Sequence, residues 1–396
     1  MAKVSVKDLD LRGKKVFIRV DFNVPIKNGA IKDDTRVRAS LPTIKYVLEQ
    51  GGTAVCASHL GRPKGGPNPE MSLRPVAARL GELLGRPVVF AEDCIGEPAK
   101  RAVAEAGSNG VVLLENLRFH PEEEKNDPAF AQQLAEVADV YVNDAFGSAH
   151  RAHASTEGVA RLMKTSAAGL LMADEVAYLG RALESPERPF VAVLGGAKVS
   201  DKLEVIQNLL GKVDALVIGG AMAYTFFKAR GVPVGKSLVE EDLLDAVREI
   251  EKRAAERKVA LELPTDHVVA EKLEAGVPTA TLKVGDAAIG ERMGLDIGPE
   301  TAARYAAIIG KAKTVFWNGP MGVFEIDAFA AGTNAVARAI AGVAGTTIIG
   351  GGDSISAVTR AGVADKISHI STGGGASLEF LGGRTLPGVA ILPEKG

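Results

Sequence analysis

A run of apolar residues in the second half of the chain stops at two glycines, and two lysines follow four residues apart. The stretch reads VAVLGGAKVSDKL and contains Lys198, Ser200 and Lys202. The apolar spacing after it predicts a helix with Ser200 as its N-cap, so Lys202 would lie in the first turn. A cation there opposes the helix dipole, at a cost of roughly 0.3–1 kcal/mol. An outside anion would explain this lysine, and a solvated lysine that tolerates the cost is the alternative.

Apolar runs in the first half of the chain are followed by arginine, histidine and other polar residues. These residues are Arg19, Asp21 and Asn23; Ser58, His59 and Arg62; Asn116 and Arg118; and His150, Arg151 and His153. Alternation along the first strand places Arg19, Asp21 and Asn23 on one face, and Arg36 follows that strand. Guanidinium groups that converge on one crevice repel each other unless they share an anion, which they bind bidentately. The pattern predicts a site for a small, multiply anionic ligand, with scattered surface ion pairs as the alternative.

Apolar runs in the second half end in glycine instead. The ends are Gly195-Gly196, Gly219-Gly220, Asn318-Gly319-Pro320 and Gly350-Gly351-Gly352-Asp353. Without a Cβ atom the backbone can approach an oxyanion, and the N–H groups at a helix start supply donors, so these ends favour a polyphosphate. Asp353 would hold Mg²⁺, which prefers a few carboxylates together with phosphate oxygens. It would alternatively serve only as the N-cap of the next helix, and the two roles can coexist.

Strand and helix patterns alternate along nearly the whole chain. Strands are expected within residues 15–24, 53–58, 87–90, 110–116, 139–146, 190–194, 215–220, 260–270, 314–319 and 346–352. Alternation of this kind predicts parallel sheets covered on both faces, and ten strands exceed one compact domain. The stretch 166–189 fits a long helix that ends at its prolines. The predicted fold class is therefore α/β, with two doubly wound parallel-sheet domains joined by a long helix and a ligand cleft between them.

Composition excludes several classes of protein. The 396 residues include 46% hydrophobic and 24% charged residues, which is ordinary for a soluble globular protein. A formal net charge of -2 argues against general nucleic-acid binding. We expect no signal peptide and no membrane segment, because no apolar run is long enough. Cys56 and Cys94 are the only cysteines, which fits a reducing cytoplasm without a disulfide framework.

Common nucleotide and hydrolase motifs are absent or incomplete. No G-x-G-x-x-G and no G-x-S-x-G occur, which argues against a Rossmann fingerprint and an α/β-hydrolase elbow. The stretch GVPVGKS, residues 231–237, is one residue short of a P-loop, because Arg230 stands where a glycine would be needed. His150 and His153 have plausible spacing for a metal but no evident partner, so we expect no zinc site.

Eight motifs in chain order resemble those of the phosphoglycerate kinase family. They are RVDFNVP, SHLGRP, LLENLRF, AHRAHAS, LGGAKVSDK, FWNGPMGVFE, GGGDS and STGGGAS, and the resemblance runs from about residue 3 to the end. It implies an N-terminal phosphoglycerate-binding domain, 1–169, on which 377–396 packs back. It also implies a connector helix, 170–186, and a nucleotide-binding domain, 187–376.

The implied activity is reversible phosphoryl transfer between 1,3-bisphosphoglycerate and ADP, giving 3-phosphoglycerate and ATP with Mg²⁺, in glycolysis. Carried over by motif, the phosphoglycerate ligands are Asp21, Phe22, Asn23, Arg36, His59, Leu60, Gly61, Arg62, Arg118 and Arg151. The implied nucleotide ligands are Gly195, Lys198, Lys202, Gly219, Gly294, Asn318, Glu325, Gly351, Gly352, Asp353 and Ser354. Asp353 is the implied metal ligand. The family is typically monomeric, so no protein, nucleic-acid or membrane partner is expected.

The mechanism that follows asks for alignment and charge compensation rather than an enzyme nucleophile. We expect Arg36 and Lys198 to flank the transferred group, with Gly373, Gly374 and Gly375 adding backbone donors. The substrate carboxylate would attack directly, in line, after the domains close and expel water.

Three positions depart from the family pattern and bear on the fit of the nucleotide. Ala221 replaces a glycine, Arg292 stands where tryptophan is common, and Ser354 replaces a threonine. Two other classes remain as alternatives on the residues alone. They are a binding protein that closes on an anion without chemistry, and a nicotinamide-dependent dehydrogenase.

Overall fold

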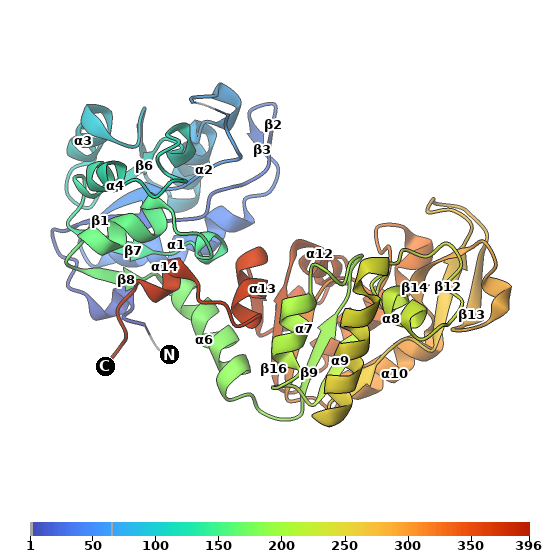
Figure 1. Cartoon of the computed structure of the whole chain (residues 1–396). Helices are drawn as coiled ribbons and strands as arrows, with labels where there is room; N and C mark the ends of the chain where they lie inside the picture. The colour runs from blue at the N-terminus through green and yellow to red at the C-terminus, as the bar shows by residue number, and fades with distance from the viewer. Residues whose placement is uncertain (1–2, 65) are drawn as a thin grey trace. The chain divides into compact units, whose positions relative to one another are not determined.

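The computed structural model describes residues 3–64 and 66–396, and it divides into two compact units (Figure 1). Unit 1 comprises Met1–Ala177 and Thr385–Gly396, and unit 2 comprises Tyr178–Arg384. The chain passes from one unit to the other within a single helix, and it returns to unit 1 only for its last segment.

Unit 1 is built on a parallel sheet with the strand order β5-β6-β4-β1-β7-β8, counted over the described residues. Its strands are β1 (Lys15–Arg19), β4 (Thr53–Ala57), β5 (Val89–Ala91), β6 (Val111–Leu114), β7 (Val140–Asn143) and β8 (Ser166–Ala168). Every residue of β4, β6 and β7 is buried, as expected for strands covered on both faces. A short antiparallel pair, β2 (Ile26–Lys27) and β3 (Ala30–Ile31), lies outside this sheet.

Helices cover the sheet of unit 1 with their apolar faces. Ile44 and Val47 of one helix and Val76 and Leu80 of the next pack into the same core as Ile18. The helices are α1 (Thr35–Glu49), α2 (Arg74–Leu84), α3 (Gly96–Ala106), α4 (Pro128–Ala135), α5 (Val159–Leu162) and α14 (Pro387–Ala390). Shorter turns are η1 (Val6–Asp8), η2 (Pro69–Met71), η3 (Leu117–Phe119), η4 (Phe146–Ser148) and the π-helical η5 (Ala154–Gly158).

The last segment of the chain completes unit 1 through backbone and side-chain hydrogen bonds. The amide of Gly388 donates to the Ala149 carbonyl at 2.8 Å, and Asn143 Nδ2 donates to the Gly388 carbonyl at 3.1 Å. In Figure 1 the red α14 accordingly lies among the blue and green elements of unit 1. The segment joins unit 1 at Thr385, later than the sequence boundary at 377, because α13 (Gly375–Leu381) packs on α7 (Leu203–Leu209) of unit 2.

The helix that connects the units is α6 (Leu170–Glu184). The sequence pattern had also placed Ser166–Ala168 in this helix, and that part of the prediction is wrong, because these residues pair in parallel with β7 as β8. The carboxylate of Asp144 starts α6 by accepting the amide of Leu171 at 3.0 Å. A side chain at Gly169 would clash with this carboxylate, so the glycine permits the strand-to-helix turn.

Unit 2 is built on a second parallel sheet, and together the two sheets confirm the predicted fold class. The strand order over the described residues is β11-β10-β9-β15-β16-β17. The strands are β9 (Phe190–Leu194), β10 (Ala215–Ile218), β11 (Ala260–Glu262), β15 (Thr314–Asn318), β16 (Thr346–Gly350) and β17 (His369–Ser371).

The helices of unit 2 follow its strands in the alternation that the sequence predicts. Besides α7 and α13 they are α8 (Ala223–Ala229), α9 (Leu244–Glu256), α10 (Pro299–Ile309), α11 (Ala331–Ala341) and α12 (Gly352–Arg360). Single turns are η6 (Glu241–Leu243), η7 (Ala287–Ile289), η8 (Asp327–Phe329) and η9 (Ala364–Lys366). Within the described ranges, no helix is both long and apolar enough to cross a bilayer.

A small antiparallel sheet in unit 2 was not predicted. It has the order β13-β12-β14, with β12 (Asp266–Ala270), β13 (Thr279–Lys283) and β14 (Met293–Ile297). The sequence pattern treated residues 260–270 as one strand, which is wrong. Pro264 separates β11 from β12, because proline lacks the N–H that a continuous strand needs.

Candidate active site

In unit 1 the predicted ligands gather around the loop that follows β1. Arg36, in the first turn of α1, donates from Nη1 to Asp21 Oδ1 at 3.2 Å and to the Asn23 carbonyl at 3.1 Å. The strand itself ends at Arg19, so the alternation predicted for Asp21 and Asn23 is wrong. These two residues lie in the loop, where Arg36 rather than strand geometry positions them.

The loops after β1 and β4 are tied together by backbone and side-chain hydrogen bonds. Asn23 Oδ1 accepts the amide of Gly61 at 2.9 Å, and Arg118 Nη1 donates to the Gly61 carbonyl at 2.8 Å. The amide of Leu60 donates to Asn116 Oδ1 at 3.1 Å. The ring of Phe22 is fully buried in the core, so Phe22 can offer a ligand only its backbone.

The cations of unit 1 lie close enough to perturb one another. We call Arg19, Arg36, His59, Arg118 and Arg151 the basic cluster. Burial lowers the pKa of Arg118, and Arg151 and Arg19 add to this effect against the opposing Glu124. Burial also holds the pKa of His59 well below its usual value, with further lowering by Arg19, Arg118 and Arg36. An anion between these groups would relieve their mutual repulsion.

The outer members of the predicted set lie at the exposed edge of this region. Arg62 is exposed and lines a shallow hollow beside Met71. Arg151 is half-buried, and its Nε donates to His150 Nε2 at 3.2 Å. His153 Nδ1 instead lies 3.9 Å from Glu123 Oε1, so the two histidines face different partners.

A different histidine does lie among metal-ligating groups, although the sequence predicted no histidine metal cluster. One ligand atom each of Asp93, Cys94 and His120 lies within 4.8 Å of the others. His120 Nε2 is 2.7 Å from Asp93 Oδ1, and burial raises the pKa of the Cys94 thiol well above its usual value. The arrangement is that of a hydrogen-bonded histidine and carboxyl group beside a protonated thiol.

In unit 2 the helix that follows the two lysines begins later in the sequence than predicted. Helix α7 begins at Leu203 with Lys202 as its N-cap, and Ser200 is not the cap. The Ser200 hydroxyl instead donates to Glu240 Oε1 at 2.5 Å. Lys202 Nζ donates to Asn318 Oδ1, and burial lowers its pKa while the nearby Asp201 and Asp353 carboxylates oppose that shift. Lys198 is exposed in the loop before α7.

The glycines at the strand ends of unit 2 fall into two groups. A Cβ atom at Gly195 would clash with the Pro320 carbonyl, and one at Gly219 would clash with the sulfur of Met321. These two glycines let neighbouring loops pack against each other. A Cβ atom at Gly352, Gly374 or Gly375 would meet nothing within 4 Å, so the backbone there faces open space. The second group leaves backbone accessible to a ligand.

Asp353 lies in the first turn of α12, and its predicted alternative role as N-cap is wrong. The cap is Gly351, whose φ of 92° lies in the region that favours glycine. Asp353 itself is exposed. Ser354 is buried, and its hydroxyl accepts the Gly319 amide at 2.7 Å. The amide of Gly373 donates to Ser371 Oγ at 3.2 Å.

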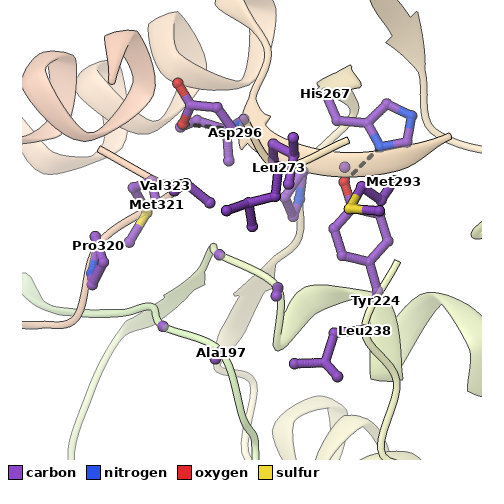
Figure 2. A pocket seen from close by; sticks show the side chains of 18 of the residues that line it. Ala197, Tyr224, Leu238, His267, Leu273, Met293, Asp296, Pro320, Met321 and Val323 are labelled. Carbon is purple, nitrogen blue, oxygen red and sulfur yellow. Dashed lines mark hydrogen bonds between the residues drawn. The ribbon is translucent and has the colours of Figure 1, made fainter. Parts of the chain in front are cut away.

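An apolar cavity of about 340 Å³ opens in unit 2, beside Asp353 and some of the strand-end glycines (Figure 2). The predicted ligands Gly294, Glu325 and Asp353 line it together with Ala221. Its apolar walls come from Leu238, Leu273, Met293, Met321 and Val323. Sequence reasoning missed these wall residues, because isolated apolar side chains have no spacing that distinguishes them from core residues.

Tyr224 and His267 form one wall of the cavity. The Tyr224 hydroxyl lies 2.7 Å from His267 Nδ1, and the rings stack with centroids 5.7 Å apart (Figure 2). A side chain at Gly294 would clash with the Tyr224 hydroxyl, so this glycine makes room for the tyrosine. Asp296, on the same strand as Gly294, accepts the Gly332 amide at 2.8 Å, and burial raises its pKa to about 7. The guanidinium of Arg292 donates to the Ile289 carbonyl at 3.3 Å.

Comparison with known proteins finds relatives that match nearly the whole chain. A family model described as "Phosphoglycerate kinase" matches residues 6–384. A relative of that name from Moorella thermoacetica is 59% identical over 395 residues, and one from Koribacter versatilis is 57% identical over 403 residues; each alignment covers 100% of both chains. The solved phosphoglycerate kinase of Coxiella burnetii superposes with a TM-score of 0.89 at 43% identity, covering 98% of each chain. That of Pyrococcus horikoshii gives 0.85 at 37% identity, again with 98% of each chain covered.

Proposed function

This chain belongs to the phosphoglycerate kinase family, and on that premise we propose how its two units divide the reaction. It carries out the family's reversible phosphoryl transfer between 1,3-bisphosphoglycerate and ADP, a step of glycolysis. The proposal concerns the parts of the molecule that bind each substrate and the side chains that act on the transferred group.

The phosphoglycerate binds to unit 1, in contact with Arg62 and with the members of the basic cluster other than the buried Arg19. The supporting observation is that Arg19 lowers the pKa values of both Arg118 and His59, with Arg151 adding to the effect on Arg118 and Arg36 to that on His59, so positive charges lie close together in this region. A carboxylate and a phosphate on one small molecule would neutralise these charges with bidentate hydrogen bonds. Asp21 and Asn23 orient Arg36 for this contact.

The nucleotide binds to unit 2, with its base in the apolar cavity and its phosphates near the start of α12. Cavities that hold small ligands are mostly apolar with a few polar groups, and this one has Glu325 and Asp353 at its rim. Lys202 and Lys198 contact the phosphates. The backbone N–H groups of the first turn of α12 supply further donors, because Gly352 leaves them uncovered.

Asp353 would hold the Mg²⁺ that accompanies the nucleotide. An exposed carboxylate is the hard oxygen ligand that this ion prefers when phosphates supply further oxygens. Bound there, the ion would offset negative charge on the phosphates. Lys202 lies close enough for Asp353 to affect its pKa, so both groups can act on the same phosphates.

Transfer requires the two substrates to meet, so we propose that the units close on each other in each turnover. The carboxylate of 3-phosphoglycerate attacks the terminal phosphorus in line, and no enzyme nucleophile takes part. Arg36 and Lys198 flank the moving group and compensate its charge. Gly374 and Gly375 add backbone donors, and exclusion of water prevents wasteful hydrolysis.

A spectrophotometric assay of ATP consumption against 3-phosphoglycerate tests the reaction, and calorimetry tests the assignment of sites. We expect Arg62→Ala to weaken 3-phosphoglycerate binding alone and Lys202→Ala to weaken MgADP binding alone. Small-angle scattering should show a smaller radius of gyration with both ligands than with either one, and an unchanged radius would contradict closure. We further propose a monomer in the cytoplasm, where free Cys56 and Cys94 stay reduced; sedimentation would reveal a dimer.

A further inference from the structure

Arg19, a buried arginine of unit 1, contacts His59 of the proposed substrate site. Arg19 is 1% exposed, and its Nη2 lies 3.2 Å from Nδ1 of His59. His59 is itself 6% exposed, at the end of the neighbouring strand β4. The strand-end pattern grouped Arg19 with the anion-binding residues, but the family motifs did not carry it over as a ligand, and its place in the structure calls for a different role.

The chemistry of the two groups fixes the direction of this hydrogen bond. A guanidinium stays protonated and has only donors, so Nδ1 of His59 must be the acceptor. A neutral imidazole with an accepting Nδ1 carries its proton on Nε2. The same contact disfavours the imidazolium form, because that form would place an N–H against a cation.

The guanidinium of Arg19 is anchored on its other sides. Its Nε donates to Ser155 Oγ at 2.7 Å, and Nη1 donates to the Val20 carbonyl. The Ser155 hydroxyl donates to Glu123 Oε1 at 2.5 Å, and the Ser155 amide donates to Glu123 Oε2 at 2.9 Å. Glu123 is fully buried. Because these contacts hold all three guanidinium nitrogens and the side chain is buried, Arg19 is fixed in place and is poorly suited to bind a substrate directly.

We propose that Arg19 is a positioning residue that holds His59 in the neutral form with its proton on Nε2. This proposal rests on the proposed function, in which His59 donates a hydrogen bond to an anionic oxygen of the phosphoglycerate. The charged and titratable groups that face His59 are Arg19, Arg36, Arg118 and His153. All of them disfavour the imidazolium, so His59 supplies a directional donor whose charge does not vary with pH.

Nuclear magnetic resonance of ligand-free protein labelled with ¹⁵N-histidine tests the tautomer directly. Spectra of His59→Gln assign the His59 signals by their loss. We expect a protonated Nε2, a non-protonated Nδ1 and no titration of His59 from pH 5.5 to 8. A protonated Nδ1, or a titration in this range, would overturn the proposal whether or not the enzyme is active.

Substitutions of the anchor test the role of Arg19. Arg19→Lys keeps the positive charge but removes the guanidinium group with its several donors. Ser155→Ala removes one hydrogen-bond acceptor of the guanidinium and leaves the group itself in place. Both should give His59 signals of mixed tautomers, and both should raise KM for 3-phosphoglycerate about 10-fold while changing kcat less than about 3-fold. Arg74→Lys, an exposed arginine paired with Glu92, is the matched control and should change neither. Unaltered His59 signals in both anchor variants would show that Arg19 does not set the tautomer.

The histidine itself separates this proposal from the proposed function. The side-chain amide of His59→Gln can donate near the position of Nε2, whereas that of His59→Asn is placed closer to Nδ1. We expect His59→Gln to keep KM for 3-phosphoglycerate within about 3-fold and His59→Asn to raise it about 10-fold. Equal, unchanged KM values in both variants, with the expected tautomer in the wild type, would remove His59 from the substrate site and leave the tautomer assignment standing.

Discussion

The two proposed sites offer opposite means of meeting negative charge. In unit 1, long charged side chains converge, and buried partners such as Asn116 and Ser155 keep their loops and guanidinium groups in place. In unit 2, the strand ends expose backbone, and glycine is needed both where loops touch each other and where a ligand would approach. Recognition by side chains therefore depends on a supporting shell of hydrogen bonds, whereas recognition by backbone depends on close packing of loops.

This difference predicts that substitutions will separate the two substrates cleanly. A change in the basic cluster should affect the acid, and a change among the glycines or the cavity walls should affect the nucleotide. Only residues that act on the transferred group itself should alter kcat strongly. The predictions below test this division, starting with the largest effect.

Lys198→Ala should have the largest effect and should not separate the two substrates. The reason is that, in our proposal, the charge of Lys198 acts on the group that is transferred between them. We expect kcat to fall by about 10²–10³, with KM for ATP changed less than about 3-fold. Steady-state kinetics measure both constants. Lys252→Ala on α9, whose side chain is 66% exposed, is the control and should leave both unchanged. A near-normal kcat in Lys198→Ala would contradict the role of this lysine.

Arg62→Ala should affect the acid alone. Loss of one charge-assisted hydrogen bond of about 1.5–3 kcal/mol should raise KM for 3-phosphoglycerate about 10- to 100-fold. KM for ATP should stay the same if the nucleotide binds to the other unit, as we propose. Arg74→Ala serves as the matched surface control. An equal rise in both KM values would show that the division is wrong.

Gly294→Ala should affect the nucleotide alone. The added methyl group would collide with the Tyr224 hydroxyl and push that ring into the cavity. We expect a loss of about 1–3 kcal/mol in the free energy of unfolding and a rise of about 10-fold in KM for ATP. Gly180→Ala, where a Cβ atom meets nothing within 4 Å, should not be destabilised. Unchanged nucleotide binding in Gly294→Ala would remove the base from this cavity.

The Asp144 carboxyl group of unit 1 and the Asp296 carboxyl group of unit 2 should each contribute to the free energy of unfolding by an amount that decreases as pH rises from about 4 to 7. Burial raises the pKa of Asp144 in unit 1 and of Asp296 in unit 2 to about 7, so the folded state binds these protons more tightly than the unfolded state. Each group contributes stability at low pH that is lost as pH rises through its folded pKa, by up to about 1.4 kcal/mol per pH unit. Urea unfolding at several pH values measures the slope.

Matched variants assign that slope to each unit. Asp144→Asn and Asp296→Asn should each remove part of the pH dependence, and each retains one oxygen that can accept a backbone amide. A slope that neither variant reduces would mean that both carboxyl groups ionise normally in the folded protein.

Ala221→Gly should have the smallest effect. Ala221 contributes one methyl group to the wall of the cavity, and removal of that group should change KM for ATP by less than about 3-fold. Phosphoglycerate binding should not change. A larger effect on the nucleotide would show that Ala221 shapes the base pocket more than its position suggests.

The sequence was sufficient for the parallel sheets, because short apolar runs and amphipathic helices alternate regularly around them. It also placed Arg36, Arg118, Lys202 and Asn318 at strand ends or helix starts. In the structure these residues lie at positions of that kind. It was not sufficient for the antiparallel sheet, because Pro264 interrupts a run that otherwise looks continuous. Short exposed strands such as β13 lack the buried pattern that marks the parallel strands.

The supporting residues were beyond sequence reasoning for a different reason. Arg19, Glu123 and Ser155 lie far apart in the sequence, and only the folded chain brings them into one hydrogen-bonded chain. Tyr224 and His267 also lie far apart in the sequence, and each on its own resembles an ordinary core residue. The helix start at Lys202 was misplaced, because Ser200 has a better partner in Glu240.

The return of the last segment to unit 1 has a consequence for biosynthesis. A ribosome must translate all of unit 2 before residues 385–396 can supply the Gly388 contacts to Asn143 and Ala149. Every residue of unit 2 is therefore synthesised before unit 1 can gain its last contacts, so unit 1 cannot be completed first, unlike the usual N-terminal-first order.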